Sequence, residues 1–419
     1  MSDIHPPSVQ TCPVEAGFDP FDPAYLADPY PIYDALRAKE PVFYAPQLNM
    51  WVVTRHADIE TVFLDPATFS ATSVHLPVTS FSPEAQQVLA NGDFRLPPVM
   101  SNVDPPTHTR IRKHNTKTFS ARRLAALEPS IRRKTEELID AFAKDGRVDL
   151  VPEFSFPLPA YTIFTLIGFP AEDRDQLKAW CANRMAMTWG RPKPEEQVAI
   201  AHNMVAFWHY CQDFVQRRVH ERTDDFTSGL LNIHDVNPEE ISQKEVASII
   251  YSFSFAGHET TTNLITNIVR QFLLRPADWK VICTDPSLIP NAVEEVLRFD
   301  TSVVAWQRVT KREVEIGGTP IPSGARVLLL LASGGRDATT FEDADMFDIR
   351  RENAKAHIAF GKGIHYCIGA PLGRMQARIA LELLSARFPS LHLASDQTLT
   401  FPPNISFRGP SHFFVEWDV

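Results

Sequence analysis

Apolar residues recur at intervals of three and four along most of this chain. That spacing places them on one face of an α-helix, so it predicts helices rather than strands. The clearest helical segments are residues 124–144, 198–222, 242–274, 290–299 and 370–388. We therefore expect a mainly α protein.

Strict alternation of apolar and polar residues is confined to short runs, which predict small β-sheets. Residues 42–44 and 50–54 flank a turn and predict a hairpin, and a short helix is predicted over residues 57–64. A second set of strands is predicted around two later turns that contain glycine. Its strands are residues 314–316, 319–321 and 326–331.

Two stretches lack both periodicities. Residues 73–103 hold several prolines and predict a long irregular loop, and loops of that length in compact domains are often functional. The first residues are polar and contain proline, so we expect residues 1–18 to be a flexible segment. No Gly/Ser-rich linker divides the remainder, which predicts a single domain over residues 19–419.

Composition and charge exclude several classes of function. A formal net charge of −10 argues against a nucleic-acid partner. The chain begins without a secretory signal, and no apolar stretch is long enough to span a membrane, so we expect a cytoplasmic location. The 5 cysteines are scattered without a Cys-x-x-Cys pair, which excludes an iron–sulfur or zinc module within this chain.

One cysteine lies in a setting that favours metal binding. Cys367 belongs to the glycine-rich segment FGKGIHYCIG, residues 360–369, which directly precedes a predicted helix. Free N–H groups and the positive end of the helix dipole favour its thiolate, which is a metal ligand. The glycines let a large flat group lie against the backbone, and Phe360 can shield the sulfur from water. The alternatives are a buried free cysteine or a phosphate loop, although the Gly-Lys-Ser/Thr ending of a phosphate loop is missing.

A polar interruption falls within the predicted helix over residues 242–274, at the segment AGHETT, residues 256–261. Its small residues allow another group to approach the helix, and a threonine can distort a helix by bonding to the carbonyl four residues earlier. The pair Glu259 and Thr260 would then face the gap. The alternative is a hydrogen-bonded polar kink in a core helix.

Both segments resemble motifs of the cytochrome P450 monooxygenases. Residues 360–369 are similar to the family's haem-binding signature, and residues 256–260 resemble its oxygen-activation motif, Ala-Gly-x-Asp/Glu-Thr. The signature residues at the family's spacing are Phe360, Gly363, Cys367 and Gly369. The resemblance runs from about Asp19 to the C-terminus. It implies the cytochrome P450 fold, a large helical domain with a small β-rich part, and a heme b cofactor (iron protoporphyrin IX).

The resemblance also implies roles for individual residues. Cys367 would bind the haem iron, Glu259 and Thr260 would deliver protons, and His258 would be a neighbour rather than a ligand. The residues that would bind the cofactor are His108, Arg112, Ala256, Arg308, Phe360, His365, Cys367 and Gly369. The residues that would line the substrate pocket, with the 73–103 loop, are Phe253, Ala256, Val303 and Val304. A structural cluster would contain Glu295, Arg298 and Arg351, with Arg350 as the rival third member.

Within the family, the chain is most similar to the haem domains of the bacterial self-sufficient class, in which a reductase is fused to the haem domain. The similar segments are WGRP at 189–192, DPSLIPNAVEE at 285–295 and SFRGP at 406–410. The chain stops at Val419 with no flavin or iron–sulfur motif, so it is expected to be free-standing or cut from such a fusion. Electrons would come from a separate ferredoxin or reductase.

The expected docking surface for that electron donor is the basic segment 108–123, near Arg110, Lys113 and Lys117. A local positive patch would attract an acidic partner. The alternative is a solvated helix face, which is the usual meaning of a charge run.

Taken together, the sequence predicts a haem-thiolate monooxygenase. It would insert one oxygen atom from O2 into a small, largely apolar substrate, expected to be aromatic, by hydroxylation or oxidative dealkylation. A peroxide-driven peroxygenase is one alternative, which the presence of Glu259 and Thr260 disfavours. A non-catalytic haem sensor is another.

Overall fold

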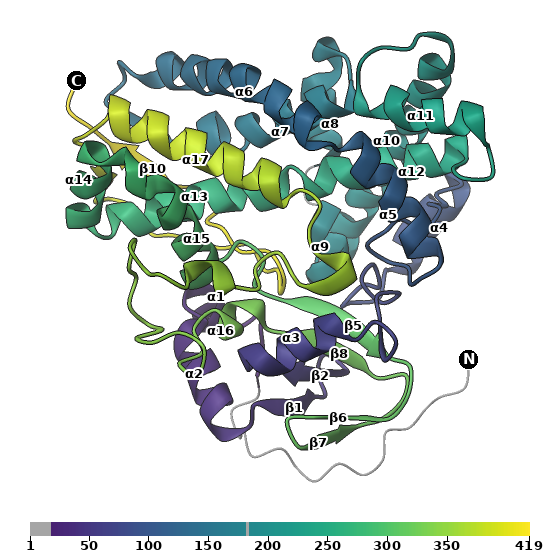
Figure 1. Ribbon diagram of the computed structural model, residues 1–419, viewed down its shortest axis with the longest axis horizontal. Coiled ribbons are helices and arrows are strands. Elements are labelled where there is room, and N and C mark those ends of the chain that lie inside the picture. Colours follow the sequence, from purple (N-terminus) through teal and green to yellow (C-terminus); the bar gives the residue numbers. More distant parts are fainter. Residues whose placement is uncertain (1–17, 182–183) are drawn as a thin grey trace.

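Helices make up most of the computed structural model, which describes residues 18–181 and 184–419 (Figure 1). The expected mainly α architecture is confirmed. Of the N-terminal segment expected to be flexible, residues 1–17 lie outside the described residues. Phe18 is buried and packs against the rings of Tyr25 and Phe43.

Outside residues 242–274, the predicted helices occur with ends close to those expected. The helices are α1 (Pro23–Ala27), α2 (Tyr30–Lys39), α3 (His56–Leu64), α4 (Pro83–Asn91), α5 (Thr107–Thr118), α6 (Ala121–Phe142), α7 (Pro157–Ile167), α8 (Arg174–Cys181), α9 (Arg184–Trp189), α10 (Pro194–His220), α11 (Phe226–Val236), α12 (Gln243–Ala256), α13 (Glu259–Leu273), α14 (Pro276–Thr284), α15 (Ile289–Phe299), α16 (Leu331–Gly334) and α17 (Ala370–Arg387). Within the described ranges, none is long and apolar enough to cross a membrane.

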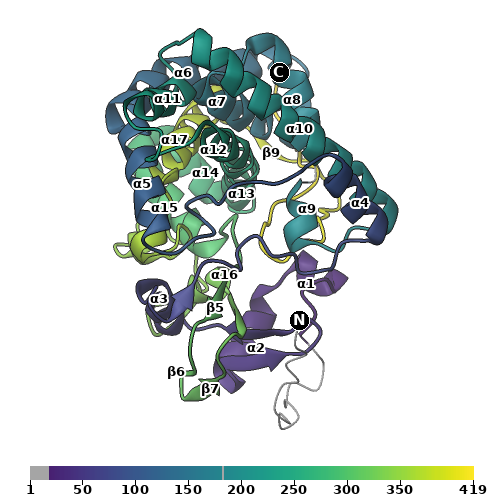
Figure 2. The same cartoon turned by 90° about the vertical axis from the view of Figure 1, so that its right-hand side faces the viewer.

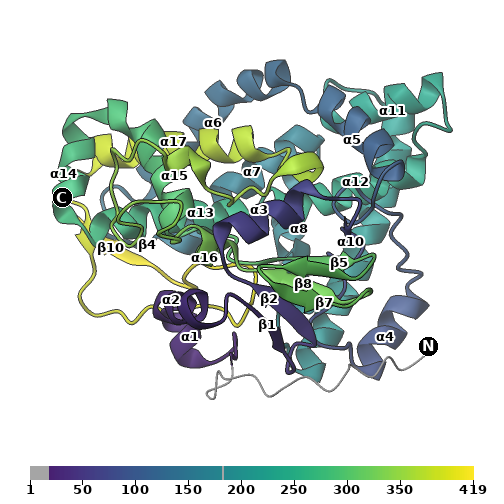
Figure 3. The same cartoon turned by 60° about the horizontal axis from the view of Figure 1, so that its bottom comes forward.

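The strands form a small part of the molecule beside the helices. They are β1 (Val42–Ala45), β2 (Met50–Val53), β3 (Phe69–Ser70), β4 (Arg147–Asp149), β5 (Trp306–Thr310), β6 (Val314–Ile316), β7 (Thr319–Ile321), β8 (Arg326–Leu329), β9 (His392–Leu393) and β10 (Phe414–Glu416). The largest sheet has the order β1-β2-β8-β5-β3, in which only β2 and β8 are parallel. Figure 3 shows this sheet with α1, α2 and α3 beside it.

The helical part is organised around α13, which is buried along most of its length. It packs against α17, α15 and α7, and these contacts cover its apolar side chains. Figure 2 shows α12 and α13 in the middle of the helical part, with α5, α15 and α17 on one side and α9 and α10 on the other. Because α13 is enclosed by other helices, side chains at its start can face an internal cavity instead of solvent.

Three predictions about elements need correction. The helix predicted over residues 242–274 is two helices, because a turn at Gly257 and His258 separates α12 from α13. The loop predicted over residues 73–103 contains α4, which begins because Ser82 accepts a hydrogen bond from the Ala85 N–H and proline follows as the first helical residue. Strand β8 extends the main sheet instead of the β6–β7 hairpin.

Candidate functional site

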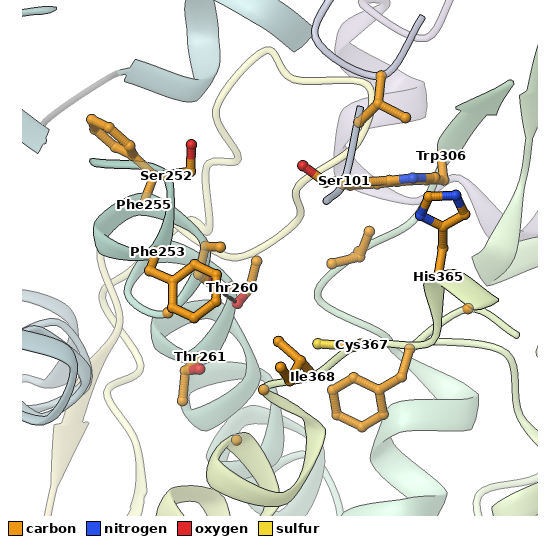
Figure 4. Close-up of a pocket in the computed structure, with 18 of the residues that line it drawn as sticks. Ser101, Ser252, Phe253, Phe255, Thr260, Thr261, Trp306, His365, Cys367 and Ile368 are labelled. Carbon is orange, nitrogen blue, oxygen red and sulfur yellow. Dashed lines mark hydrogen bonds between the residues drawn. The ribbon is translucent and has the colours of Figure 1, made fainter. Parts of the chain in front are cut away.

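An internal cavity of about 310 Å³ lies where α12 meets α13, facing α9, β5 and the loop before α17. Its wall is mainly apolar and aromatic. Figure 4 shows Cys367 projecting into this space from the loop, on the side facing Thr260. The predicted site residues that line the cavity are Arg112, Phe253, Ala256, Thr260, Val303, Arg308, Phe360, His365, Cys367 and Gly369.

The glycines of the cysteine loop shape its path. Gly361 and Gly363 have φ angles of 68° and 66°, a region that other residues rarely adopt. A Cβ atom at Gly363 would lie 2.6 Å from the Phe63 carbonyl oxygen, so only glycine lets the loop pass so close to α3. The Cys367 N–H donates to the Phe360 carbonyl oxygen at 3.0 Å, which closes the loop just before α17.

Opposing effects act on the pKa of the Cys367 thiol. Burial raises the pKa of its thiol, while the N–H groups of Gly369 and Ala370 and the charge of Arg112 act to lower it. Burial is the larger effect, so the loop and helix start do not by themselves favour the thiolate, contrary to the sequence-based expectation. A cation bonded to the sulfur would supply the missing stabilisation, as a metal does for a coordinated thiolate.

Thr260 is positioned by the break between α12 and α13. Its Oγ1 donates to the Ala256 carbonyl oxygen at 2.8 Å, which is the backbone bond expected from the sequence. At the break, a Cβ atom on Gly257 would lie 2.7 Å from the side chain of Ile163, so the small residue is needed for packing against α7. Ala256 and Thr260 therefore present a small apolar side chain and a hydroxyl to the cavity.

Glu259 does not share that position, although the sequence suggested that it would face the gap with Thr260. It is absent from the cavity wall, and burial raises its pKa to about 7, with Arg184 acting to lower it. His258 is also directed away from the cavity. Its ring lies edge-on to Phe156, with 4.1 Å between centroids, and burial lowers its pKa to about 3.

Cationic and imidazole groups gather near Cys367. The rings of His108 and His365 are 4.3 Å apart, and Arg112 and Arg308 line the same end of the cavity. Burial lowers the pKa of Arg308 to about 10, with nearby Asp104 opposing the shift. The buried Nε2 of His365 has no hydrogen-bond partner among the described residues.

These residues fit a buried, flat cofactor that carries two carboxylates. Within the described ranges, no aspartate or glutamate lines the cavity, so Arg112 and Arg308 face it without an acidic counterpart on the wall. Buried cations ordinarily require anionic partners. A haem with two propionates would supply them, and Cys367 is the sulfur ligand that the same cavity offers.

The cluster of Glu295, Arg298 and Arg351 is buried. Arg298 donates to both carboxylate oxygens of Glu295 at 2.7 Å, and Arg351 donates to one of them at 3.2 Å. The two arginines also bind backbone carbonyls between residues 335 and 346, so the cluster anchors that segment. The rival residue, Arg350, is exposed.

Val304 does not line the cavity, which corrects the expectation for the substrate pocket. Its N–H donates to the Ser406 carbonyl oxygen at 2.7 Å, and its side chain packs in a separate core cluster with Ala305 and Leu330. Val303 does line the cavity. The sequence could not distinguish the two, because adjacent residues in an extended segment point to opposite sides.

A second buried network behind the cysteine loop was missed from the sequence. Glu294 accepts two hydrogen bonds from Arg374, at 2.7 and 2.9 Å, and one from His357 at 3.0 Å. These partners lower the pKa of Glu294 to about 2, against the opposing effect of its burial. Arg374 also lies over the Phe360 ring at 4.5 Å, so the network supports the first residue of the cysteine loop. Two consecutive glutamates, Glu294 and Glu295, were the feature of the sequence that could have indicated a second buried acid.

Arg110 is not a free surface charge. It donates to the Glu240 carbonyl oxygen and forms an ion pair with Glu245, both at 2.5 Å. Lys113 and Lys117, on the same helix, are exposed.

Known relatives match most of the chain, and a family model matches its C-terminal part. The family model "Cytochrome P450" matches residues 286–412. Vitamin D(3) 25-hydroxylase of Pseudonocardia autotrophica is 38% identical over 379 residues, which are 90% of each protein. The structure of cytochrome P450 CREJ in complex with (4-ethylphenyl) dihydrogen phosphate matches with a TM-score of 0.92 and 41% identity, over 96% of this chain and 99% of that one.

An intact type IV self-sufficient cytochrome P450 monooxygenase also matches, with a TM-score of 0.93 and 38% identity. The match covers 96% of this chain and 52% of that longer one. The likeness to the reductase-fused class expected from the sequence is therefore confirmed. With a curated relative at 38% identity across 90% of the chain, and with the same fold throughout, this chain belongs to the cytochrome P450 family of haem-containing monooxygenases.

Proposed function

We propose that this cytochrome P450 inserts one oxygen atom from O2 into a small aromatic substrate, by hydroxylation or oxidative dealkylation. The observation that carries the proposal is the cavity itself. In it, Thr260 and Ala256 lie on the side facing Cys367, and aromatic and aliphatic side chains form most of the wall. When bound, haem supplies the iron at which O2 is activated. Cys367 would hold that iron, and Arg112, Arg308, His108 and His365 would hold the propionates.

Thr260 and Glu259 are proposed to manage the protons of the reaction. The Thr260 hydroxyl donates its hydrogen bond to the Ala256 carbonyl oxygen, so its own oxygen remains free to accept a hydrogen bond from a group in the cavity. A pKa near 7, raised by burial, lets Glu259 take up and release a proton near neutral pH. Because Glu259 lies outside the cavity wall, it would act on Thr260 or on water from behind the α12–α13 break.

The aromatic substrate class is supported by the wall of the cavity. Phe253, Phe255 and Trp306 offer ring faces and edges to a bound molecule. The ligand in the related CREJ structure is itself an aromatic compound. A small ring with an alkyl or ether substituent could place that substituent beside Thr260.

A separate ferredoxin or reductase is proposed as the electron donor. Lys113 and Lys117 are exposed on α5, and the same helix carries Arg112 to the cavity wall. A donor bound over these lysines would lie close to the cofactor end of the cavity.

An isotope experiment tests the proposed reaction. The haem-loaded protein, with a ferredoxin and its reductase, is given 4-ethylphenol and 4-methoxybenzoate under 18O2, and the products are analysed by mass spectrometry. We expect one 18O atom in each new hydroxyl group of a hydroxylated product, or in the aldehyde co-product before exchange. Equal product yield from hydrogen peroxide alone would favour the peroxygenase alternative. Absence of product from every aromatic compound tried would contradict the proposal.

A further inference from the structure

Three arginines line the cavity, and the proposed function uses two of them. Arg112 and Arg308 lie near Cys367 and His365, where haem propionates would bind. The third, Arg184, begins α9 and lies over the ring of Phe255, 5.7 Å from its centroid. Figure 4 places Phe255 farther from Cys367 than Thr260 is. A cation therefore remains at the end of the cavity opposite the cysteine, with no role yet assigned.

Arg184 has few partners of its own. Its Nη1 donates to the Thr188 hydroxyl at 3.0 Å, and its buried Nε has no hydrogen-bond partner among the described residues. In the described part of the chain, no carboxylate oxygen lies within 4.0 Å of its guanidinium nitrogens. The charge of Arg184 acts to lower the pKa of Glu259, against the larger effect of burial, but in the described residues no ion pair joins the two side chains.

Neutral polar groups gather at the same end. His75 Nε2 and Ser101 Oγ are 3.2 Å apart, and both residues line the cavity. Burial and, to a lesser extent, the charge of Arg184 lower the pKa of His75 to about 4, so this imidazole is neutral at pH 7. A partly buried guanidinium whose neighbours are neutral groups and aromatic rings is unfavourable unless an anion pairs with it.

We propose that Arg184 is the recognition site for an anionic group of the substrate, a carboxylate or a phosphate ester. The inference rests on the proposed function, since it places the substrate in the same cavity. The anion would accept charge-assisted hydrogen bonds from Arg184, with the hydroxyls of Ser101 and Thr188 as further donors. The apolar body would extend past Phe253 toward Thr260, so oxidation would fall at the end of the molecule remote from the anion.

The test uses ligands of matched shape and different charge. Isothermal titration calorimetry of the haem-loaded protein compares 4-isopropylbenzoate and 4-isopropylphenyl phosphate with the neutral 4-isopropylbenzamide. We expect at least one anion to bind about tenfold or more tightly than the amide, because charge-assisted hydrogen bonds are stronger than neutral ones. The preference between carboxylate and phosphate identifies the anion that the site takes.

Variants then assign the preference to Arg184. Arg184→Met, which keeps the length of the side chain, should remove the preference while changing amide affinity by less than about threefold. Arg184→Lys should keep part of it, and Arg133→Met, on an exposed arginine of α6, should keep all of it. If the Arg184→Met protein does not bind haem, Arg184→Gln replaces it and should likewise lose the preference for anions while keeping its affinity for the amide.

Two results would overturn the inference. One is equal or absent binding of acids and amide by the wild type, and the other is an anion preference that survives loss of the guanidinium. Both are distinguishable from failure of the proposed function, because the reduced, CO-bound spectrum reports the haem-thiolate centre whether or not a ligand binds.

Discussion

The Thr260 hydroxyl is fixed by a hydrogen bond across the α12–α13 break, to the carbonyl oxygen of Ala256 at the end of α12, and Thr260 lines the cavity. The same type of bond occurs at Thr262, whose Oγ1 donates to the His258 carbonyl oxygen at 3.0 Å, but Thr262 is buried away from the cavity. The two threonines thus share local geometry and differ in what they face. We therefore expect a chemical role for Thr260 and a structural one for Thr262.

We expect Thr260→Ala to bind substrate normally and to form product inefficiently. Without the hydroxyl, protons are no longer positioned at bound oxygen, so product per NADPH should fall to about a tenth or less, with peroxide released instead. The measurement pairs substrate-induced absorbance shifts with product and peroxide yields. Thr262→Ala is the matched control, and equal coupling in both variants would contradict the role.

Glu259 makes the stability of the protein depend on pH. Burial raises its pKa from 4.5 to about 7, so the folded chain holds a proton that the unfolded chain releases above about pH 4.5. The contribution of this group is therefore full below pH 4.5 and is lost as pH rises toward 7, by up to about 3 kcal/mol.

A comparison with Glu259→Gln isolates this effect. Relative to the variant, the wild type should lose stability between pH 4.5 and 7 and then remain level. Thermal melting followed by circular dichroism at several pH values gives the difference directly. A constant difference in Tm across this range would show that the carboxyl titrates normally.

Much of the secondary structure could be predicted because periodic patterns in long helices are unambiguous, as for α6, α10 and α17. The break between α12 and α13 could not be located from the sequence, because the helical period continues across Gly257 and His258. At the break, Gly257 packs against Ile163 of α7, and periodicity along the chain does not report such a contact between distant segments. Likewise, the charged cluster could be identified from Glu295 and Arg298, but whether Arg350 or Arg351 completes it depends on the fold.

The buried cluster anchors α15 to the segment that follows α16, and its loss should destabilise the whole domain. Arg298 is fully buried and binds Glu295 and three backbone carbonyls. Arg298→Met leaves the Glu295 charge buried with one fewer partner, which should cost about 3–5 kcal/mol and reduce haem retention. Denaturant unfolding and the haem-to-protein absorbance ratio measure both effects. Arg350→Met should change stability by less than about 0.5 kcal/mol, and equal losses in the two variants would be inconsistent with this role.

Across the molecule, α5 links the cofactor end of the cavity to the surface. Its inner side carries His108 and Arg112, and its outer side carries Lys113 and Lys117. Such an arrangement could not be derived from the charge run alone, since Arg110 of the same run is used in an ion pair with Glu245. The surface proposed for the electron donor is therefore smaller than the sequence suggested.

Charge reversal at Lys113 and Lys117 should slow the first electron transfer from an acidic ferredoxin at low ionic strength. The rate should fall by about tenfold, and the difference from wild type should shrink with added salt because screening weakens the attraction. Stopped-flow reduction under CO measures this rate. Reversal of Lys39 and Lys144, which are exposed elsewhere, gives the same net charge and should have little effect. Equal slowing in both double variants would rule out this surface as a specific docking site.

The central claim is that Cys367 holds haem iron through its sulfur, and the reduced, CO-bound absorption spectrum tests it most directly. We expect the wild type to show the red-shifted Soret band that a thiolate ligand produces, and Cys367→His to bind haem without it. Cys283→Ser, at another free cysteine, should leave the band in place. A red-shifted band that persists in Cys367→His, or that is missing from freshly reduced wild type, would contradict the account.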